Sequence, residues 1–220
     1  MKLIIFDLDE TIVELFKFHN KTIELTFKKV FNVKAKLDEI DFPGQTIEKN
    51  LENLAKLKGI KNDEIKKKIP KAIDVYSKIF VSIMPKDIKK DILPGVYDII
   101  KRLSRNKENK LVIVTGDSRL ITRAILKKAG LLKYFAFMIT GEREKDRTKL
   151  TKYAIKKSRI NKAIVIGDSI HEVKAAKEVR ALAISVLTGF HSKEELKKAG
   201  SRHIFKNLDD KRIIKLIEEY

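Results

Sequence analysis

Five short apolar runs along the chain have the length and composition of strands buried in a parallel sheet. They are Leu3 to Phe6, Leu111 to Val114, Ala136 to Ile139, Ala163 to Ile166 and Leu182 to Val186. Near-continuous apolar runs are typical of strands that are covered on both faces. From residue 94 onward, helical patterns separate successive runs. This alternation predicts an α/β fold with a three-layer, doubly wound, mostly parallel sheet of the Rossmann-like kind.

The interval from residue 14 to 86 departs from this alternation. It holds three helical patterns and no clear strand: Phe16 to Phe31, Thr46 to Leu57 and Asp63 to Ile83. We therefore expect an inserted all-helical cap domain after the first strand. The predicted division is an α/β core of residues 1–13 and 87–220 and a helical cap of residues 14–86.

Composition narrows the class of protein. The chain has 220 residues, of which 43% are hydrophobic, which suffices for one core and a smaller attached domain. No apolar run is long enough to span a bilayer or to form a signal-peptide core, so we expect a cytoplasmic protein without a membrane partner. The absence of cysteine excludes disulfides and thiolate metal sites.

The net charge of +19 raises the question of a nucleic-acid partner. The lysines are scattered along helical stretches, and the sequence has neither a zinc-finger pattern nor an interleaved aromatic platform. We therefore interpret the charge as a solvated surface that favours anionic substrates by steering, and nucleic-acid binding is not expected as the main function.

Two acidic segments follow predicted strands, where ligands bind in open α/β sheets. Asp7 and Asp9 come directly after the first strand, and residues two apart in an extended chain point the same way. Their carboxylates repel, which a divalent cation or a division into acid and base would relieve. After the strand that ends at Ile166, Asp168 and Glu172 would complete a site for a hard cation such as Mg²⁺.

Two further segments offer groups that bind an anion. Thr115 and Gly116 provide a hydroxyl and backbone N–H groups at the start of a helix. In the basic segment Lys145 to Lys149, a lysine could neutralise a carboxylate and a phosphate. Each segment also has an ordinary interpretation, because Asp117 and Ser118 are good helix caps and most lysines of such a chain are solvated.

The order of these segments resembles the haloacid dehalogenase-like hydrolase superfamily across nearly the whole chain. The helical interval resembles the cap of its phosphoglycolate-phosphatase-like branch, as do Leu93 to Val96, Gly130 to Phe135, and Thr188-Gly189. The resemblance implies a Mg²⁺-dependent phosphatase that hydrolyses a small phosphorylated metabolite, a phosphomonoester, through an aspartyl-phosphate intermediate. A phosphomutase acting on a sugar phosphate and a basic nucleic-acid-binding protein that retained the fold remain alternatives.

The resemblance also implies roles for single residues. Asp7 is the nucleophile, and Asp9 is the general acid and base, whose backbone carbonyl also binds metal. Thr115 and Gly116 hold the phosphoryl group. Asp7, Asp9 and Asp168 hold Mg²⁺, and Glu172 supports that site from behind or through water.

Two further assignments follow from the resemblance. Lys145 pairs with Asp7 and the phosphate, with Lys149 as the second choice. Gly44, Gln45 and Thr46 form a cap turn that contacts the substrate beyond its phosphate, although Thr46 could simply cap the following helix. No catalytic role is expected for the histidines. His171 lies between Asp168 and Glu172 but is expected to point to solvent or to cap a helix, and the other three have no Asp, Glu or His partner at a ligand spacing: His19, His191 and His203.

Overall fold

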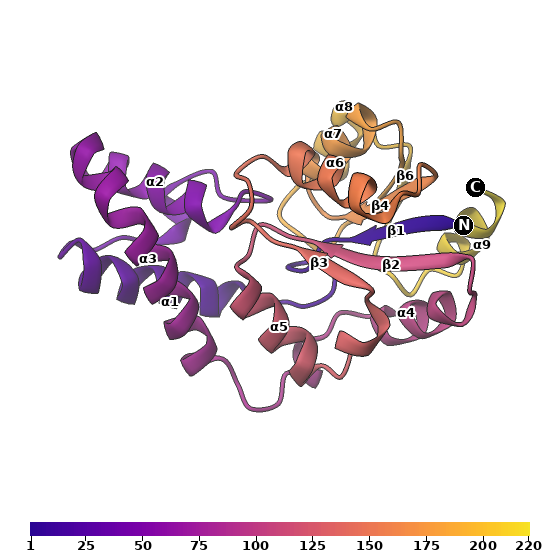
Figure 1. Cartoon of the computed structure of the whole chain (residues 1–220), viewed down its shortest axis with the longest axis horizontal. Coiled ribbons are helices and arrows are strands. Elements are labelled where there is room, and N and C mark those ends of the chain that lie inside the picture. Colours follow the sequence, from indigo (N-terminus) through magenta and orange to yellow (C-terminus); the bar gives the residue numbers. More distant parts are fainter.

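The computed structural model describes residues 1–220 and contains one six-stranded sheet (Figure 1). Its strands are β1 (Lys2–Phe6), β2 (Asn109–Val114), β3 (Phe137–Ile139), β4 (Ala163–Gly167), β5 (Leu182–Val186) and β6 (His203–Phe205). The order is β3-β2-β1-β4-β5-β6, and every neighbouring pair is parallel. The first strand of the sequence therefore lies inside the sheet, between β2 and β4.

Helices account for most of the remaining chain. They are α1 (Phe16–Val30), α2 (Ile47–Leu57), α3 (Asn62–Ile83), α4 (Val96–Arg105), α5 (Arg119–Lys128), α6 (Arg147–Ser158), α7 (Ile170–Glu178), α8 (Lys193–Ala199) and α9 (Arg212–Glu219). Short 3₁₀ helices are η1 (Leu37–Glu39), η2 (Lys89–Asp91) and η3 (Leu132–Tyr134). None of these helices combines the length and the apolar composition that crossing a membrane requires.

Helices cover both faces of the sheet, which makes the three layers. Successive side chains of a strand alternate between its faces. Ile4 and Phe6 of β1 join an apolar cluster with residues of α4, α5 and α9. Leu3 and Ile5 join a second cluster with residues of α6 and α7. Because both sets are fully buried, β1 is fixed at the centre of the molecule, and so is the loop that follows it.

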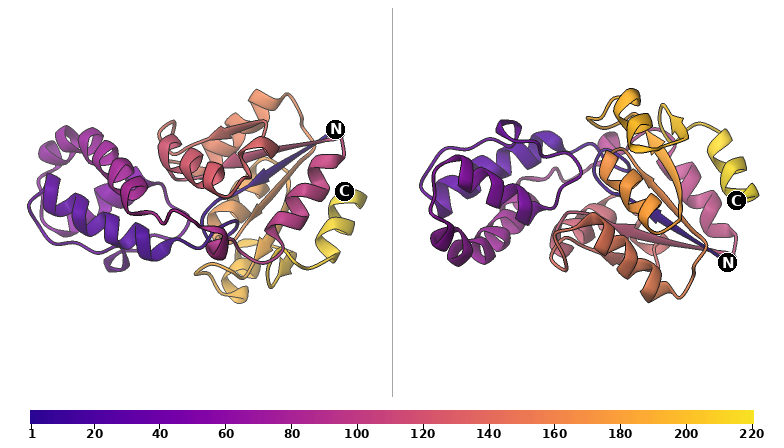
Figure 2. Two further views of the ribbon diagram at one scale, coloured as in Figure 1. Left: turned by 90° about the horizontal axis from the view of Figure 1, so that it is seen from below. Right: turned by 90° about the horizontal axis from the view of Figure 1, so that it is seen from above.

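Three helices, α1 to α3, lie beyond the carboxyl end of β1 rather than over a face of the sheet (Figure 2). We call them the cap helices. Their apolar positions recur three or four residues apart, as with Ile23, Phe27 and Val30 of α1, so each helix buries one stripe against the others. Lys128 of α5 donates to the carbonyl oxygens of Met84 and Pro85, where the chain returns from the cap to the sheet.

The predicted fold class is confirmed: an α/β, doubly wound, parallel sheet with an all-helical insertion. All five predicted strands are present, although β3 begins at Phe137 rather than Ala136. β6 was not predicted, because only two of its three residues are apolar and they do not form a recognisable run. The division of the chain at residues 13/14 and 86/87 stays a prediction.

Candidate active site

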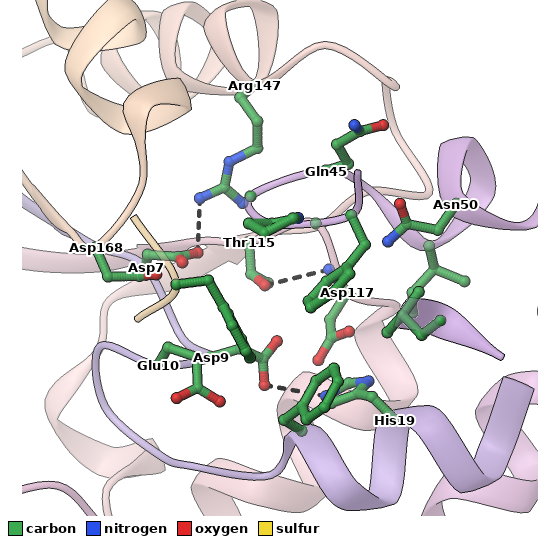
Figure 3. A pocket seen from close by; sticks show the side chains of 18 of the residues that line it. Asp7, Asp9, Glu10, His19, Gln45, Asn50, Thr115, Asp117, Arg147 and Asp168 are labelled. Atoms are coloured by element: carbon green, nitrogen blue, oxygen red, sulfur yellow. Dashed lines mark hydrogen bonds and ion pairs between the residues drawn. The ribbon is translucent and has the colours of Figure 1, made fainter. Parts of the chain in front are cut away.

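The strand order brings the polar strand ends together. Because β1 lies between β2 and β4, the connections on its two sides leave toward opposite faces and open a crevice at the carboxyl ends. Asp7 follows β1, Thr115 follows β2 and Asp168 follows β4, and all three line one pocket (Figure 3). The cap helices and the turn before α2 form the opposite wall of this pocket.

A buried ionic group surrounds Asp7. Arg147 Nη2 donates to Asp7 Oδ1 at 2.6 Å and to Glu172 Oε1 at 2.5 Å. Thr11 Oγ1 donates to Asp168 Oδ1 at 3.0 Å. Oxygens of the three carboxylates all lie within 4.8 Å of one another. We call Asp7, Arg147, Asp168 and Glu172 the Asp7 group.

Burial alters the proton affinity of these acids. It raises the pKa of Asp7 to about 7, against the opposing effect of Arg147 and with a further increase from Glu172. Burial and then the charges of Glu172 and Asp7 raise the pKa of Asp168 well above its usual value. Three carboxylates thus face one guanidinium. A divalent cation with oxygen ligands would balance that charge, so the Asp7 group fits Mg²⁺.

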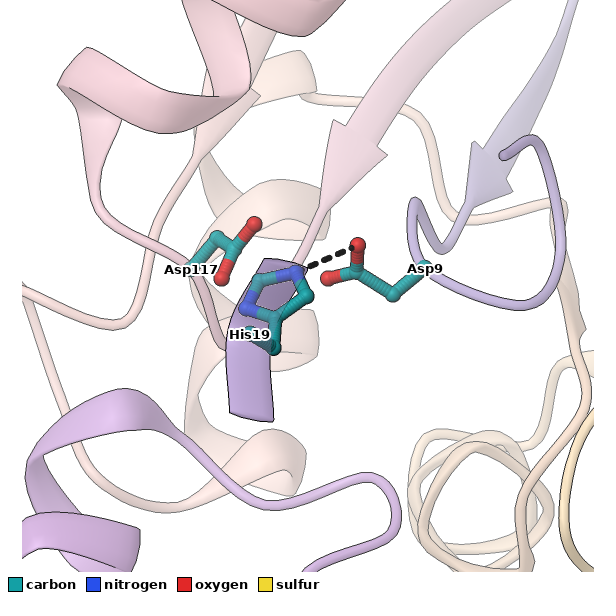
Figure 4. Close-up of side chains that lie close together, drawn as sticks. All are labelled: Asp9, His19 and Asp117. Atoms are coloured by element: carbon teal, nitrogen blue, oxygen red, sulfur yellow. Dashed lines mark hydrogen bonds and ion pairs between the residues drawn. The ribbon is translucent and has the colours of Figure 1, made fainter. Parts of the chain in front are cut away.

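A second buried group lies around Asp9 (Figure 4). His19 Nε2 donates to Asp9 Oδ1 at 3.1 Å, and His19 Nδ1 lies 2.6 Å from the Tyr76 hydroxyl. The Asp117 carboxylate faces the same ring, and its Oδ2 has no hydrogen-bond partner. Burial alone would lower the pKa of His19, but Asp9 and Asp117 outweigh it and raise that pKa to about 9. The two carboxylates therefore favour the imidazolium form of His19, which donates to Asp9 and orients it.

The loop after β2 supplies the predicted anion-binding groups. Thr115 lines the pocket, and its Oγ1 accepts a hydrogen bond from the Asp117 N–H at 3.1 Å. Gly116 lies so close to the cap that a Cβ there would come 2.4 Å from the carbonyl oxygen of Gln45. Ser118 is the N-cap of α5, as its ordinary interpretation predicted.

The predicted cap turn reaches the pocket at Gly44 and Gln45. Gln45 already bonds within the cap: Nε2 donates to the Asp41 carbonyl at 2.5 Å, and Oε1 accepts from Asn53 at 3.3 Å. Thr46 does not line the pocket; its hydroxyl accepts from the Lys49 N–H at 3.3 Å and caps α2. The capping interpretation of Thr46 is the one that the structure supports.

The predicted pairing of Lys145 with Asp7 is wrong. Lys145 lies in the loop before α6, and its Nζ contacts Glu48 at 2.9 Å and Glu52 at 2.7 Å, both on the cap helix α2. Lys149, the second choice, is exposed and pairs with Glu144 at 3.5 Å. The cation beside Asp7 is Arg147, whose side chain is 7% exposed.

Helical phase explains this result. Arg147 is the first residue of α6 and precedes Leu150, Thr151 and Ala154 by three, four and seven positions. All four are buried, so Arg147 lies on the inward stripe of the helix. In the sequence, the helical pattern of this segment is clear only from Leu150 onward, so the phase that turns Arg147 inward was missed.

His19 and Asp117 were also missed as members of the site. His19 lies on a cap helix, and its partners Asp9 and Tyr76 come from two other parts of the chain. Asp117 could be recognised only as a possible helix cap. No spacing in the sequence connects these residues, because the fold alone brings α1, α3 and the loop after β2 together.

Fold and site define a doubly wound α/β protein with a buried acidic centre at the topological switch point, covered by a helical cap. The family model of the haloacid dehalogenase-like hydrolases matches residues 4–186. The chain belongs to this family, which confirms the predicted superfamily and the prediction that the protein is an enzyme.

Individual relatives have low sequence identity to this chain. A phosphoglycolate phosphatase from Synechococcus elongatus is 27% identical over 107 residues, which are 48% of this chain and 50% of that relative. The match thus spans about half the length of this curated relative.

Two solved structures share the fold over almost the whole length. One is described as a predicted phosphatase from Clostridium acetobutylicum, with a TM-score of 0.78, 23% identity, and coverage of 100% of this chain and 99% of that one. The other is a β-phosphoglucomutase from Clostridium difficile, with a TM-score of 0.82, 18% identity, and coverage of 99% and 96%.

Proposed function

We propose that the chain is a Mg²⁺-dependent phosphatase that hydrolyses a small phosphomonoester through an aspartyl-phosphate on Asp7. The observation that carries this proposal is the Asp7 group. In it a buried carboxylate at the end of β1 lies 2.6 Å from a guanidinium and within 4.8 Å of two further acids. Family membership and the name of the Synechococcus relative agree with it.

In the proposed reaction, an Asp7 oxygen attacks the phosphorus atom in line, and the bond from phosphorus to the alcohol oxygen breaks. Asp9 gives a proton to the leaving oxygen. Water then attacks the phosphorus atom of the aspartyl-phosphate, and the bond from phosphorus to the Asp7 oxygen breaks. Asp9 takes the proton of that water, and inorganic phosphate leaves. His19 positions Asp9 for both proton transfers through the 3.1 Å hydrogen bond.

The remaining residues bind charge. Both ion pairs of Arg147 use Nη2, which leaves Nη1 and Nε to bind phosphoryl oxygens, together with the Thr115 hydroxyl. Asp7, Asp168 and the Asp9 carbonyl would hold Mg²⁺, with Glu172 behind them. Bound there, Mg²⁺ would neutralise charge on the transferring phosphoryl group.

The test is to trap the phosphoenzyme. The purified chain is mixed with phenyl phosphate and Mg²⁺, quenched in acid within the first turnover, and mapped by mass spectrometry. We expect phosphate on Asp7, none in Asp7→Asn, and slower formation and breakdown in Asp9→Asn. Phosphate on another residue, or full turnover after exhaustive metal removal, would contradict the proposal.

A further inference from the structure

The pocket extends beyond the phosphoryl-binding end into the cap, and its charge there is unusual for this chain. The chain has 49 lysine and arginine residues. Of these, only Arg147 lines the pocket, and His19 is the one other group that can be cationic. Five acids line it as well: Asp7, Asp9, Glu10, Asp117 and Asp168.

Neither cation is free to take a second anionic group of a substrate. Arg147 lies between Asp7 and Glu172 at the phosphoryl end. His19, when charged, is matched by Asp9 and Asp117, and when neutral it has no charge to offer. A carboxylate or second phosphate at the cap end would therefore lose its water without gaining a partner.

The cap end is built for uncharged groups. Phe16, Phe42 and Phe190 pack against one another with ring centroids 4.9 to 5.1 Å apart. Ile23, Leu37 and Ile47 extend the apolar lining. These side chains favour carbon skeletons over ions.

Asn50 adds a polar group to this apolar lining. Asn50 of α2 lines the pocket, and its Oδ1 is buried without a hydrogen-bond partner (Figure 3). A buried acceptor left without a partner costs free energy, and a rotation of the Asn50 side-chain amide that brings Oδ1 to the pocket would let a donor on a ligand recover it. A hydroxyl group is such a donor and carries no charge.

We infer that the substrate is the phosphate ester of an uncharged, hydroxyl-bearing alcohol, and that Asn50 recognises the hydroxyl. An ester whose leaving group carries a carboxylate or a second phosphate is rejected. The inference rests on the proposed function. It disfavours phosphoglycolate as substrate despite the name of the Synechococcus relative. It also disfavours a mutase reaction through a sugar bisphosphate, which would need a second cationic site.

The first test compares two esters that share one carbon skeleton. Glycerol 3-phosphate ends in an uncharged hydroxymethyl group, and 3-phosphoglycerate ends in a carboxylate. We expect kcat/KM for phosphate release to be at least about 100-fold higher for glycerol 3-phosphate, since an unpaired buried charge is rejected strongly. A kcat/KM for 3-phosphoglycerate equal to or higher than that for glycerol 3-phosphate would overturn the inference. A kcat/KM for glucose 1,6-bisphosphate equal to or higher than that for glucose 1-phosphate would overturn it as well.

A second test uses variants. Asn50→Lys adds a cation at the cap end and should narrow the ratio between the two three-carbon esters at least about tenfold. Asn62→Lys adds the same charge at an exposed position of α3 and should leave that ratio unchanged. A ratio unchanged in Asn50→Lys, in a variant that retains turnover, would contradict the placement of the leaving group.

A third test separates the inference from the proposed function. Calorimetry compares binding of 2-hydroxyethylphosphonate and phosphonoacetate, whose carbon–phosphorus bonds resist hydrolysis. Tighter binding of 2-hydroxyethylphosphonate supports the inference even if no ester is hydrolysed, an outcome that would overturn the phosphatase proposal alone. Equal or tighter binding of phosphonoacetate overturns the inference, whatever the turnover.

Discussion

Arg147 places one guanidinium between two buried carboxylates. Arginine suits this position better than lysine, because its guanidinium stays charged and offers five N–H donors in a fixed plane. Burial by itself would lower the pKa of Arg147, but Asp7 and then Glu172 outweigh burial and raise it. The charge beside the proposed nucleophile is therefore permanent, and its orientation is fixed by two contacts.

We expect Arg147→Ala to lower kcat about 10²- to 10³-fold, as for the loss of other preorganised electrostatic donors. Arg147→Lys should recover only part of that loss, because an ammonium cannot reproduce the planar contacts. Lys145→Ala and Lys149→Ala are the matched controls and should change kcat less than about threefold, since exposed ion pairs contribute little. Steady-state kinetics with thermal melts of each folded variant make the comparison, and a larger loss in Lys145→Ala would return the role to Lys145.

Glu10 combines two costs at one position. Its φ of 55° lies in the left-handed region that disfavours residues with a Cβ. Its side chain is buried, and Oε1 has no hydrogen-bond partner. Burial, followed by repulsion from Asp9, raises the pKa of Glu10 to about 8. A strained backbone and an unpaired acid thus occur together beside Asp9.

We expect Glu10→Gly to raise the free energy of unfolding by about 1 kcal/mol, because glycine adopts this φ without strain. Glu10→Gln keeps the strain and removes the acid, so it separates the two costs. Arg159→Gly is a matched backbone control, since Arg159 has a φ of 58° at the exposed end of α6. Urea unfolding measures all three, and a Glu10→Gly variant less stable than the parent would show that the side chain contributes favourably.

At the scale of elements, the turn before α2 fits tightly against the loop after β4. Gly44 has a φ of 68°, and a Cβ there would lie 2.2 Å from Ser169 Oγ and 2.9 Å from the His171 ring. Beside it, Lys145 joins the loop before α6 to Glu48 and Glu52 of α2. The cap thus contacts the core at points that depend on the shape of single residues.

We expect Gly44→Ala to lower kcat/KM about 100-fold, because displacing the cap by about 1 Å misplaces the groups that it holds over the substrate. Gly59→Ala is a matched control: Gly59 has a φ of 74° in the turn between α2 and α3, with no atom within 4 Å of a Cβ. Both substitutions introduce similar backbone strain, but only the Cβ of Gly44→Ala would clash with the core, at Ser169 and His171. Equal kinetics in the two variants would show that the close contact does not affect activity.

At the scale of the whole molecule, charge is unevenly divided. The chain carries +19 overall, while the acids of the Asp7 group outnumber its one cation. A positive surface steers anionic substrates toward the protein. The acidic centre still carries more negative than positive groups and can bind a further cation. The net charge of this chain therefore says little about the charge of its pocket.

We expect Mg²⁺ to raise the melting temperature, because an ion that binds only the folded state stabilises it by about 2.7 kcal/mol at 100 times its Kd. For a chain of this length that corresponds to about 5–10 °C. Asp168→Asn should lose the shift, while Glu194→Gln, at an exposed position of α8, should retain it. A melting temperature that does not respond to Mg²⁺ in the parent chain would argue against a metal at the Asp7 group.

The sequence alone determined the fold class and the place of the pocket. Apolar runs report burial locally, so each strand could be recognised from its own residues, and parallel strands present their carboxyl ends at one edge. Asp7, Thr115 and Asp168 could therefore be assigned to one site without knowledge of any contact. β6 could not be recognised in this way, because its place in the sheet depends on pairing with β5 rather than on its own composition.

Only the tertiary structure decided which side chains complete that site. Lys145 and Arg147 are two residues apart in the same basic segment. Because α6 starts between them, Lys145 contacts the cap and Arg147 contacts Asp7. His19 meets Asp9 only because α1 lies beyond the carboxyl end of β1, beside the loop that holds Asp9. The reason is physical: hydrophobic burial follows the local pattern of a chain, whereas the partner of a charge depends on which elements pack together.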